Sequence, residues 1–161
     1  MPNRKNAFTL IELVMVIVII AVLVAVVSFS SGTLKLTGVA NKLMFDLRYA
    51  QQLAISRQVS CGTSFNPAGN SYFVYVGDTG TLATNPHTGS NLSIDYDIDS
   101  DYSGISLVST NFGDQVSFDA AGAPYGSTGA LLATRGIITL QSGSDTKTVT
   151  IEANTGEVKV P

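Results

Sequence analysis

The feature that most constrains this chain is an apolar run near its N-terminus. Residues 8–29 read FTLIELVMVIVIIAVLVAVVSF, and Glu12 is the only ionisable side chain among them. At about 1.5 Å per residue, a helix over these residues is roughly 33 Å long, enough to cross the hydrocarbon core of a membrane. No proline interrupts residues 8–57, so the helix can continue beyond the apolar run. We therefore expect a transmembrane and assembly helix at 8–29.

The position of Glu12 separates this run from simpler membrane segments. A secretory signal peptide has a shorter apolar core, followed by a small-residue cleavage pattern that is missing here. An uncleaved anchor explains the length but not the carboxylate near the start of the span, because burying that group is costly. Cleavage between Ala7 and Phe8 would create an α-amino group, and that group of a neighbouring subunit could pair with Glu12 in an assembled helix bundle.

The segment KNAFTLIELVMVIVIIAVLVAVV at 5–27 resembles the N-terminal signature of type IV prepilins and type II secretion pseudopilins. The resemblance implies that prepilin peptidase removes residues 1–7 as a leader and that the new terminal residue, Phe8, is N-methylated. It also implies that Glu12 recruits the subunit into the filament. Ala7 departs from the pattern, since most members have glycine there, but alanine is the smallest alternative and cleavage should survive.

The distribution of charge predicts the topology and excludes one class of partner. Arg4 and Lys5 precede the apolar run and no comparable cluster follows it, so we expect the N-terminus in the cytoplasm and the head in the periplasm. Loss of residues 1–7 would remove these two positive charges and change the formal charge from −3 to −5. No basic patch remains for a phosphate backbone, so we expect no nucleic-acid partner.

Beyond the span, the spacing predicts an amphipathic continuation of the helix at 30–58, resuming after residues 28–32. Its apolar stripe should carry the head, and it consists of Leu36, Val39, Ala40, Leu43, Leu47, Ala50 and Ala54. Phe45 and Tyr49 lie on the opposite side. They either lie under a loop or face neighbouring helices in a filament.

The period changes to that of strands after Arg57, which predicts a β-rich periplasmic head at 59–161. We expect strands at 59–65, 72–76, 92–98, 105–112, 116–119, 136–141, 146–152 and 157–160. Residues 66–70 read as a hairpin turn and residues 77–91 as a polar loop. The fold class is therefore α+β, with a long N-terminal helix packed against an antiparallel sheet head, as in pilins.

Three segments narrow the resemblance further. LRYAQQLAISRQ at 47–58, VSFDAAGAPY at 116–125 and GIITLQSGSDTKTVTIEANTGEVKV at 136–160 are together similar to the GspH/FimT group of minor pseudopilins and minor pilins. The resemblance implies other pilins or pseudopilins, prepilin peptidase and an inner-membrane assembly platform as partners.

The remaining candidate chemistry is sparse. Four aspartates stand at alternate positions within and just after the strand expected at 92–98: Asp95, Asp97, Asp99 and Asp101. Counting from Asp99, Gly104 fits the sixth place of an EF-hand calcium loop, but Thr110 stands where that loop needs a bidentate glutamate. A solvated strand face is the simpler interpretation, and Asp99 and Asp101 stay weak calcium candidates.

Cysteine and histidine are too few for a zinc or thiol-nucleophile site, since Cys61 and His87 are the only ones in the chain. Cys61 fits a buried strand thiol and His87 an exposed loop residue. No GxSxG, P-loop or HExxH pattern is present, so we expect neither enzyme activity nor a cofactor.

The leading hypothesis is a minor subunit of a type II secretion pseudopilus or a type IV pilus, working near the filament tip. A major pilin, a membrane-tethered binding domain that never polymerises, and a DNA-uptake pilin are the alternatives, and the missing basic patch argues against the last.

Overall fold

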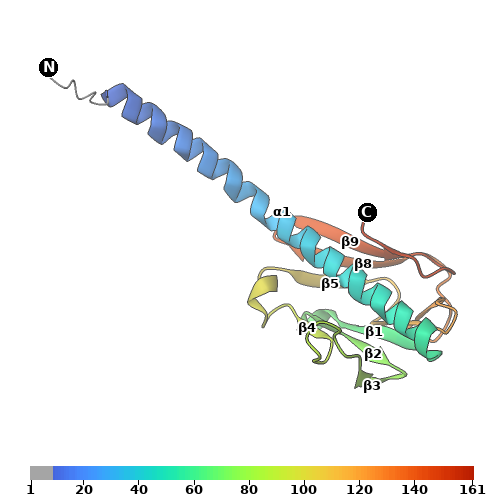
Figure 1. Cartoon of the computed structure of the whole chain (residues 1–161). Helices are drawn as coiled ribbons and strands as arrows, with labels where there is room; N and C mark the ends of the chain where they lie inside the picture. The colour runs from blue at the N-terminus through green and yellow to red at the C-terminus, as the bar shows by residue number, and fades with distance from the viewer. Residues whose placement is uncertain (1–8) are drawn as a thin grey trace.

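A long helix, α1 (Leu10–Arg57), organises the molecule. The computed structural model describes residues 9–161 and, within α1, the side chains outside 25–32. The first half of α1 projects away from the head, and its second half lies across the sheets (Figure 1). Thr9 caps its N-terminus, and Gln58, in the left-handed conformation at φ 56°, ends it.

The expected interruption of the helix at 28–32 is wrong, because α1 is continuous through these residues. A glycine inside a helix costs only about 1 kcal/mol relative to alanine, and no proline removes a hydrogen bond in this stretch. The leader, with Ala7 and Phe8, lies outside the described residues. Among the side chains that are described, no helix combines the length and apolarity that a membrane crossing requires.

The head consists of two antiparallel sheets. The first has the order β3 (Asp78–Leu82), β2 (Ser71–Val76), β1 (Cys61–Asn66), β6 (Gln115–Phe118) and β7 (Pro124–Gly126), and β4 (Ser93–Asp95) also pairs with β2. The second has the order β10 (Val158–Lys159), β9 (Asp145–Ile151), β8 (Gly136–Ser142) and β5 (Ser106–Thr110). Two short 3₁₀ helices, η1 (Pro67–Gly69) and η2 (Ser100–Tyr102), complete the elements.

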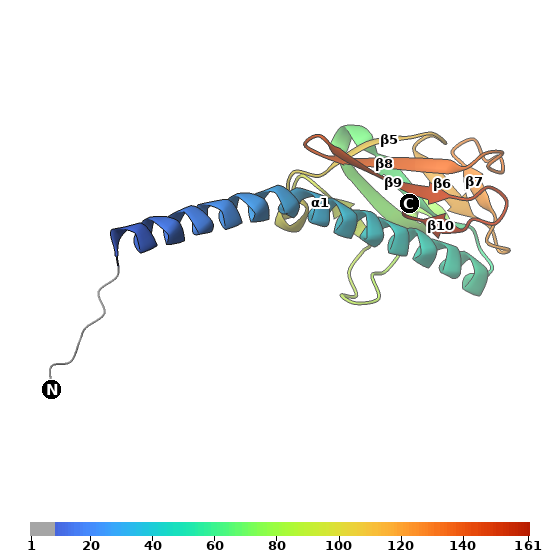
Figure 2. The same cartoon turned by 90° about the horizontal axis from the view of Figure 1, so that it is seen from above.

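The core lies between α1 and the inner faces of both sheets. All seven residues of the predicted helical stripe are buried, and they pack against Phe65, Val116, Phe118 and Ile151, among others. The α+β fold with an antiparallel head is thus confirmed. Viewed from above, the head occupies one end of the molecule, and the first half of α1 reaches from the head to the opposite end (Figure 2).

The side chain of Asn70 joins the two sheets. Its backbone sits at φ 45° at the end of η1, and its amide is buried beside the open edge of β5. Asn70 Oδ1 accepts a hydrogen bond from Leu107 N at 2.7 Å, and its Nδ2 donates to Ile105 O at 2.9 Å. The amide therefore takes the place of a strand partner at this edge, where unpaired backbone groups would otherwise be buried.

Besides β7, which no expected strand covers, two segments differ from the sequence prediction. Part of the expected polar loop at 77–91 forms the exposed edge strand β3. The expected strand at 92–98 is shortened to β4, and the chain then turns, because the Asp95 carboxylate accepts the backbone N–H groups of Asp97 and Ile98. Local turn chemistry of an aspartate thus prevails over alternation in this segment.

Candidate assembly surface

The start of α1 is closed by a capping box. The Thr9 hydroxyl accepts the backbone N–H of Glu12 at 3.3 Å, and the Glu12 carboxylate accepts from the backbone N–H and the hydroxyl of Thr9 at 3.5 and 3.4 Å. Sequence analysis missed this second role of Glu12. Its signal is the Thr-x-x-Glu spacing directly before an apolar run.

The helix turns that follow carry apolar side chains that the rest of the described chain does not cover. From Leu10 to Val24 every large apolar side chain is between 48% and 81% exposed. Soluble monomers rarely expose continuous apolar surfaces of this extent, so this surface marks contact with a membrane or with other helices.

Two polar contacts hold α1 where it leaves the head. Thr33 Oγ1 donates to Asp145 Oδ2 at 2.8 Å, and Lys35 Nζ donates to Ser103 O at 2.9 Å. They attach the helix to the hairpin between β8 and β9 and to the segment after η2. The end of the head that carries both segments is therefore the end next to the projecting helix (Figure 1).

A buried carboxylate lies between α1 and the first sheet. Asp46 is only 7% exposed; it accepts from Lys42 Nζ at 2.7 Å and from the Tyr72 hydroxyl at 2.7 Å. Burial raises the pKa of Tyr72 well above its ordinary value, so this hydroxyl stays protonated and donates to the carboxylate. The charge is thus compensated in place, as a buried carboxylate requires.

The two aromatic residues opposite the stripe have different surroundings. Tyr49 is half-buried and donates to Thr84 O at 3.0 Å, while Phe45 is 59% exposed. A hollow of about 230 Å³ separates this helix face from residues 85–87, and His87 lies on its lining. Of the two expectations for this face, the loop covers Tyr49, whereas Phe45 stays available to a neighbour.

The three segments that carry the GspH/FimT resemblance meet at the other end of the head. Gln51 Nε2 donates to Gly122 O at 2.8 Å and to Thr155 O at 3.1 Å, so one helix side chain holds two turns. Gly156 has φ 67°, and a side chain there would collide with Gly122 O. Only glycine fits this close approach of the two turns.

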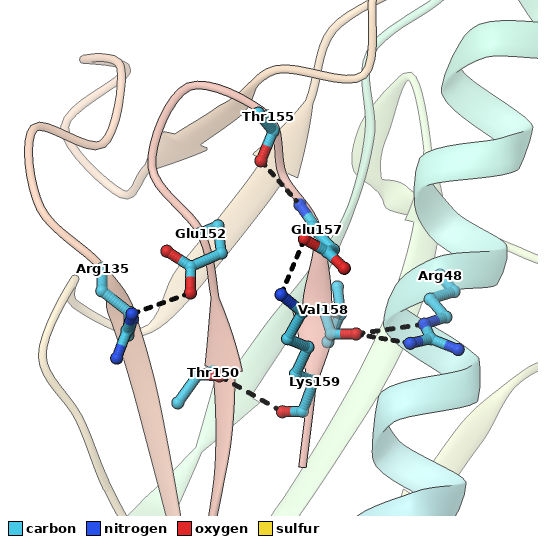
Figure 3. Close-up of polar contacts among 8 residues, drawn as sticks. All are labelled: Arg48, Arg135, Thr150, Glu152, Thr155, Glu157, Val158 and Lys159. Atoms are coloured by element: carbon cyan, nitrogen blue, oxygen red, sulfur yellow. Dashed lines mark hydrogen bonds and ion pairs between the residues drawn. The ribbon is translucent and has the colours of Figure 1, made fainter. Parts of the chain in front are cut away.

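Arg48 fixes the last strand to the helix. Its Nε and Nη2 donate to the carbonyl of Val158 at 3.1 and 2.7 Å (Figure 3). In the same region Arg135 pairs with Glu152 at 2.9 Å across the ends of β8 and β9. These contacts connect the last strand to α1, and the start of β8 to the end of β9, at the end of the head that lies away from the projecting helix.

The candidate calcium ligands do not come together. Asp99 Oδ1 caps η2 by accepting from Asp101 N at 3.0 Å, and both side chains are exposed. Across the part of the chain that the structure describes, no three His, Cys, Asp or Glu side chains form a group that could hold a metal. Cys61 is buried, and burial raises the pKa of its thiol.

Two family descriptions match the chain. Residues 2–28 match the prokaryotic N-terminal methylation motif, and residues 39–156 match the type II transport protein GspH. No curated protein matches the chain significantly.

Two kinds of solved structure share the fold. The type IV minor pilin FimU of Pseudomonas aeruginosa is 14% identical over 78% of this chain and 92% of that chain, with a TM-score of 0.55. The minor pseudopilin EpsH of the type 2 secretion system of Vibrio cholerae is 10% identical over 79% and 96%, with a TM-score of 0.57. The chain therefore belongs to the GspH family of type II transport proteins, and in it a methylation motif precedes the part that matches this family.

Proposed function

We propose that this protein is a minor pseudopilin or minor pilin that enters a filament through α1 and presents its head near the filament tip. Its family and the minor pilin and pseudopilin that share its fold support a minor filament subunit. The filament serves protein secretion or pilus biogenesis, and the role of the protein is assembly, without catalysis or nucleic-acid binding.

One observation carries the proposal: the two halves of α1 have different surroundings. Its second half supplies the stripe that completes the core, whereas its first half has no buried side chain among those described. An isolated helix of this kind has no water-facing polar side, so it requires a membrane before assembly and other helices afterwards.

The methylation motif and the charges before the apolar run support a location in the inner membrane. The segment that starts at Phe8 spans the inner membrane once, with the N-terminus in the cytoplasm and the head in the periplasm. Prepilin peptidase cuts between Ala7 and Phe8, Phe8 is then methylated, and an inner-membrane platform moves the subunit into the filament.

Intact-mass analysis of the full chain, extracted from membranes of cells with and without prepilin peptidase, tests this proposal. With the peptidase, we expect the loss of residues 1–7 and one added methyl group on Phe8. An Ala7→Gly variant should be processed at least as completely as the parent, and an Ala7→Leu variant should keep its leader. A mature protein that still carries Met1 would refute the prepilin assignment.

A further inference from the structure

The side of α1 that faces away from the head stays apolar and exposed beyond the first half of the helix. Leu23, Leu34 and Phe45 follow one another at intervals of 11 residues and are 60%, 72% and 59% exposed. Eleven residues make about three helical turns, so these side chains lie on one side of α1. The apolar surface of the first half therefore continues along the second half.

This outward side presents no charge without a partner. Lys35 and Arg48 donate to backbone carbonyls of the head at 2.9 and 2.7 Å, and Lys42 pairs with Asp46 at 2.7 Å. Residues 33–49 contain no other charged side chain. Charged residues are depleted from the centres of protein interfaces, so this side of the helix fits an apolar partner.

Gly38 lies between Leu34 and Phe45 on the same side of α1. A Cβ at this position would have no neighbour within 4 Å, so the head does not require a glycine here. Glycine inside a helix costs about 1 kcal/mol relative to alanine. Small residues let the backbones of two helices approach closely, which gives this glycine a use that the single chain does not explain.

The outward side ends at a hollow of about 230 Å³ between α1 and the loop from β3 to β4, which we call the Phe45 socket. Its apolar lining comes from Phe45, Tyr49, Pro86 and Leu92. It is smaller than the roughly 300–1,000 Å³ of small-molecule sites, so it fits a side chain of another protein. The loop passes α1 on the side away from β8 and β9 (Figure 2).

Under the proposed function the bilayer does not reach this socket. Phe45 lies 16 residues after Phe29, where the apolar run ends. At about 1.5 Å per residue this distance is roughly 24 Å along the helix. Phe45 therefore stands in the periplasm, and a protein has to cover it.

We propose that the side of α1 with Leu34, Gly38 and Phe45 receives the apolar N-terminal helix of a different filament subunit, and that one side chain of that helix enters the Phe45 socket. The partner exposes the same kind of helix surface that this chain exposes from Leu10 to Val24. The inference rests on the proposed function, because a filament is what places parallel helices beside one another. A parallel neighbour brings the corresponding turns to Phe45 when it is shifted by roughly 30–50 Å along the axis.

Photo-cross-linking of the full chain, in cells that carry its assembly system, tests the contact. With benzoylphenylalanine in place of Phe45, irradiated filaments should contain this chain linked to the apolar N-terminal peptide of another subunit, identified by mass spectrometry. The same replacement at Gln52, exposed on the same side about two turns further and beyond the loop, should give less than a tenth of this product. A cross-link from residue 45 to a head segment, or to a second copy of this chain, would overturn the inference.

Substitution of Phe45 tests the chemistry of the surface. Phe45→Gln should lower incorporation into filaments at least fivefold and leave the Tm of the detergent-solubilised full chain unchanged, because Phe45 is exposed and lies outside the core. Phe45→Leu keeps an apolar side chain and should assemble like the parent. Ile98→Gln is the matched control, because Ile98 is an 83% exposed apolar side chain on the turn after β4. Normal incorporation of Phe45→Gln would show that this side of α1 is not an assembly surface.

His87 provides a test of the socket itself, because it lies on the wall opposite α1. Its backbone N–H donates to Asn85 Oδ1 at 2.9 Å, so the shape of the turn does not depend on the imidazole. His87→Trp should fill the socket and lower the yield of the residue-45 cross-link at least fivefold, whereas His87→Ala should keep it. Equal yields for His87→Trp and the parent would mean that no partner side chain enters the socket, against the proposal.

Sedimentation of sheared filaments separates this inference from the proposed function. Chains that sediment with filaments but give no cross-link from residue 45 to a helix overturn the inference and leave the proposed function standing. If the parent chain never enters filaments, the proposed function fails together with this inference.

Discussion

Glu12 caps the helix, and the prepilin resemblance implies a second role for it. Its carboxylate closes the capping box with Thr9, and the prepilin resemblance assigns it the recruitment of the subunit into the filament. The first role needs an acceptor at the third helical position, which glutamate and glutamine both provide, whereas pairing with an amino group needs the charge. The two roles can therefore be separated by substitution.

We predict that Glu12→Gln and Glu12→Val are both processed and inserted but fail to enter the filament. Glu12→Gln keeps the capping box and loses the charge, and Glu12→Val loses both. Sedimentation of filaments, scored against total membrane-bound protein, measures the defect. Normal incorporation of Glu12→Gln would show that capping, and not charge, is what assembly requires.

The hydroxyl of Tyr72 is the second group whose effect can be isolated. It donates to the buried carboxylate of Asp46, and a hydrogen bond to a charged group is worth about 1.5–3 kcal/mol. Tyr72→Phe should lower the free energy of unfolding of the detergent-solubilised chain by about that amount in a denaturant titration. Tyr49→Phe is the control, because the Tyr49 hydroxyl donates to Thr84 O near the surface. Its loss should lower the free energy of unfolding by less than about 1 kcal/mol, since hydrogen bonds between neutral groups contribute little. Equal losses for both variants would contradict the argument that the buried carboxylate depends on Tyr72.

At the scale of elements, the second half of α1 connects two turns of the head that belong to different sheets. Gln51 holds the turn after β6 and the turn after β9 with one amide. A Gln51→Ala change should expose the amides of residues 120–123 and 153–156 to faster hydrogen exchange and cost about 1–3 kcal/mol, from two hydrogen bonds.

Gln52→Ala is the matched control, because Gln52 is exposed on the same turn of α1. It should leave both exchange and stability unchanged within about 0.5 kcal/mol. Unchanged exchange in the Gln51 variant would mean that the two turns are held by their own glycine geometry.

The elements differ in how well the sequence predicts them. The stripe from Leu36 to Ala54 was predictable, because a 3.6-residue period sustained over many turns is specific to a helix with one buried face. β3 was missed because its segment, DTGTL, is polar and exposed, and an edge strand outside the core has no apolar alternation to reveal it.

The candidate site was predictable only where a local motif encodes it. Glu12 stands out as a lone charge in an apolar run, and its capping role follows from its spacing to Thr9. The hollow of about 340 Å³ that residues 111–113 and 126–136 line could not be predicted, because the strand order is what brings these two segments together. The same holds for Asp46, whose partner Tyr72 lies 26 positions along the chain.

At the scale of the whole molecule, stability and assembly occupy different parts of the chain. Every buried apolar side chain in the described part lies between Leu36 and Val158, and the turns of α1 before residue 25 contribute none. The polar contacts that hold α1 against the head begin at Thr33. The head therefore contains its own complete core, and under the proposed function the first half of α1 is free to exchange a membrane for a helix bundle.

This division predicts the behaviour of truncated chains. A fragment of residues 33–161 should be folded, monomeric at micromolar concentration and stable to within about 1 kcal/mol of the full chain in detergent, or roughly 2–8 °C in Tm. A fragment that starts at residue 44 loses Leu36, Val39, Ala40 and Leu43, all buried in the core. Large core truncations cost about 2–5 kcal/mol each, so their sum approaches the whole stability of a domain, and this shorter fragment should not fold. Thermal melts and size-exclusion chromatography measure both outcomes. A 33–161 fragment that unfolds would show that the first half of α1 stabilises the head, and the separation of assembly from stability would be wrong.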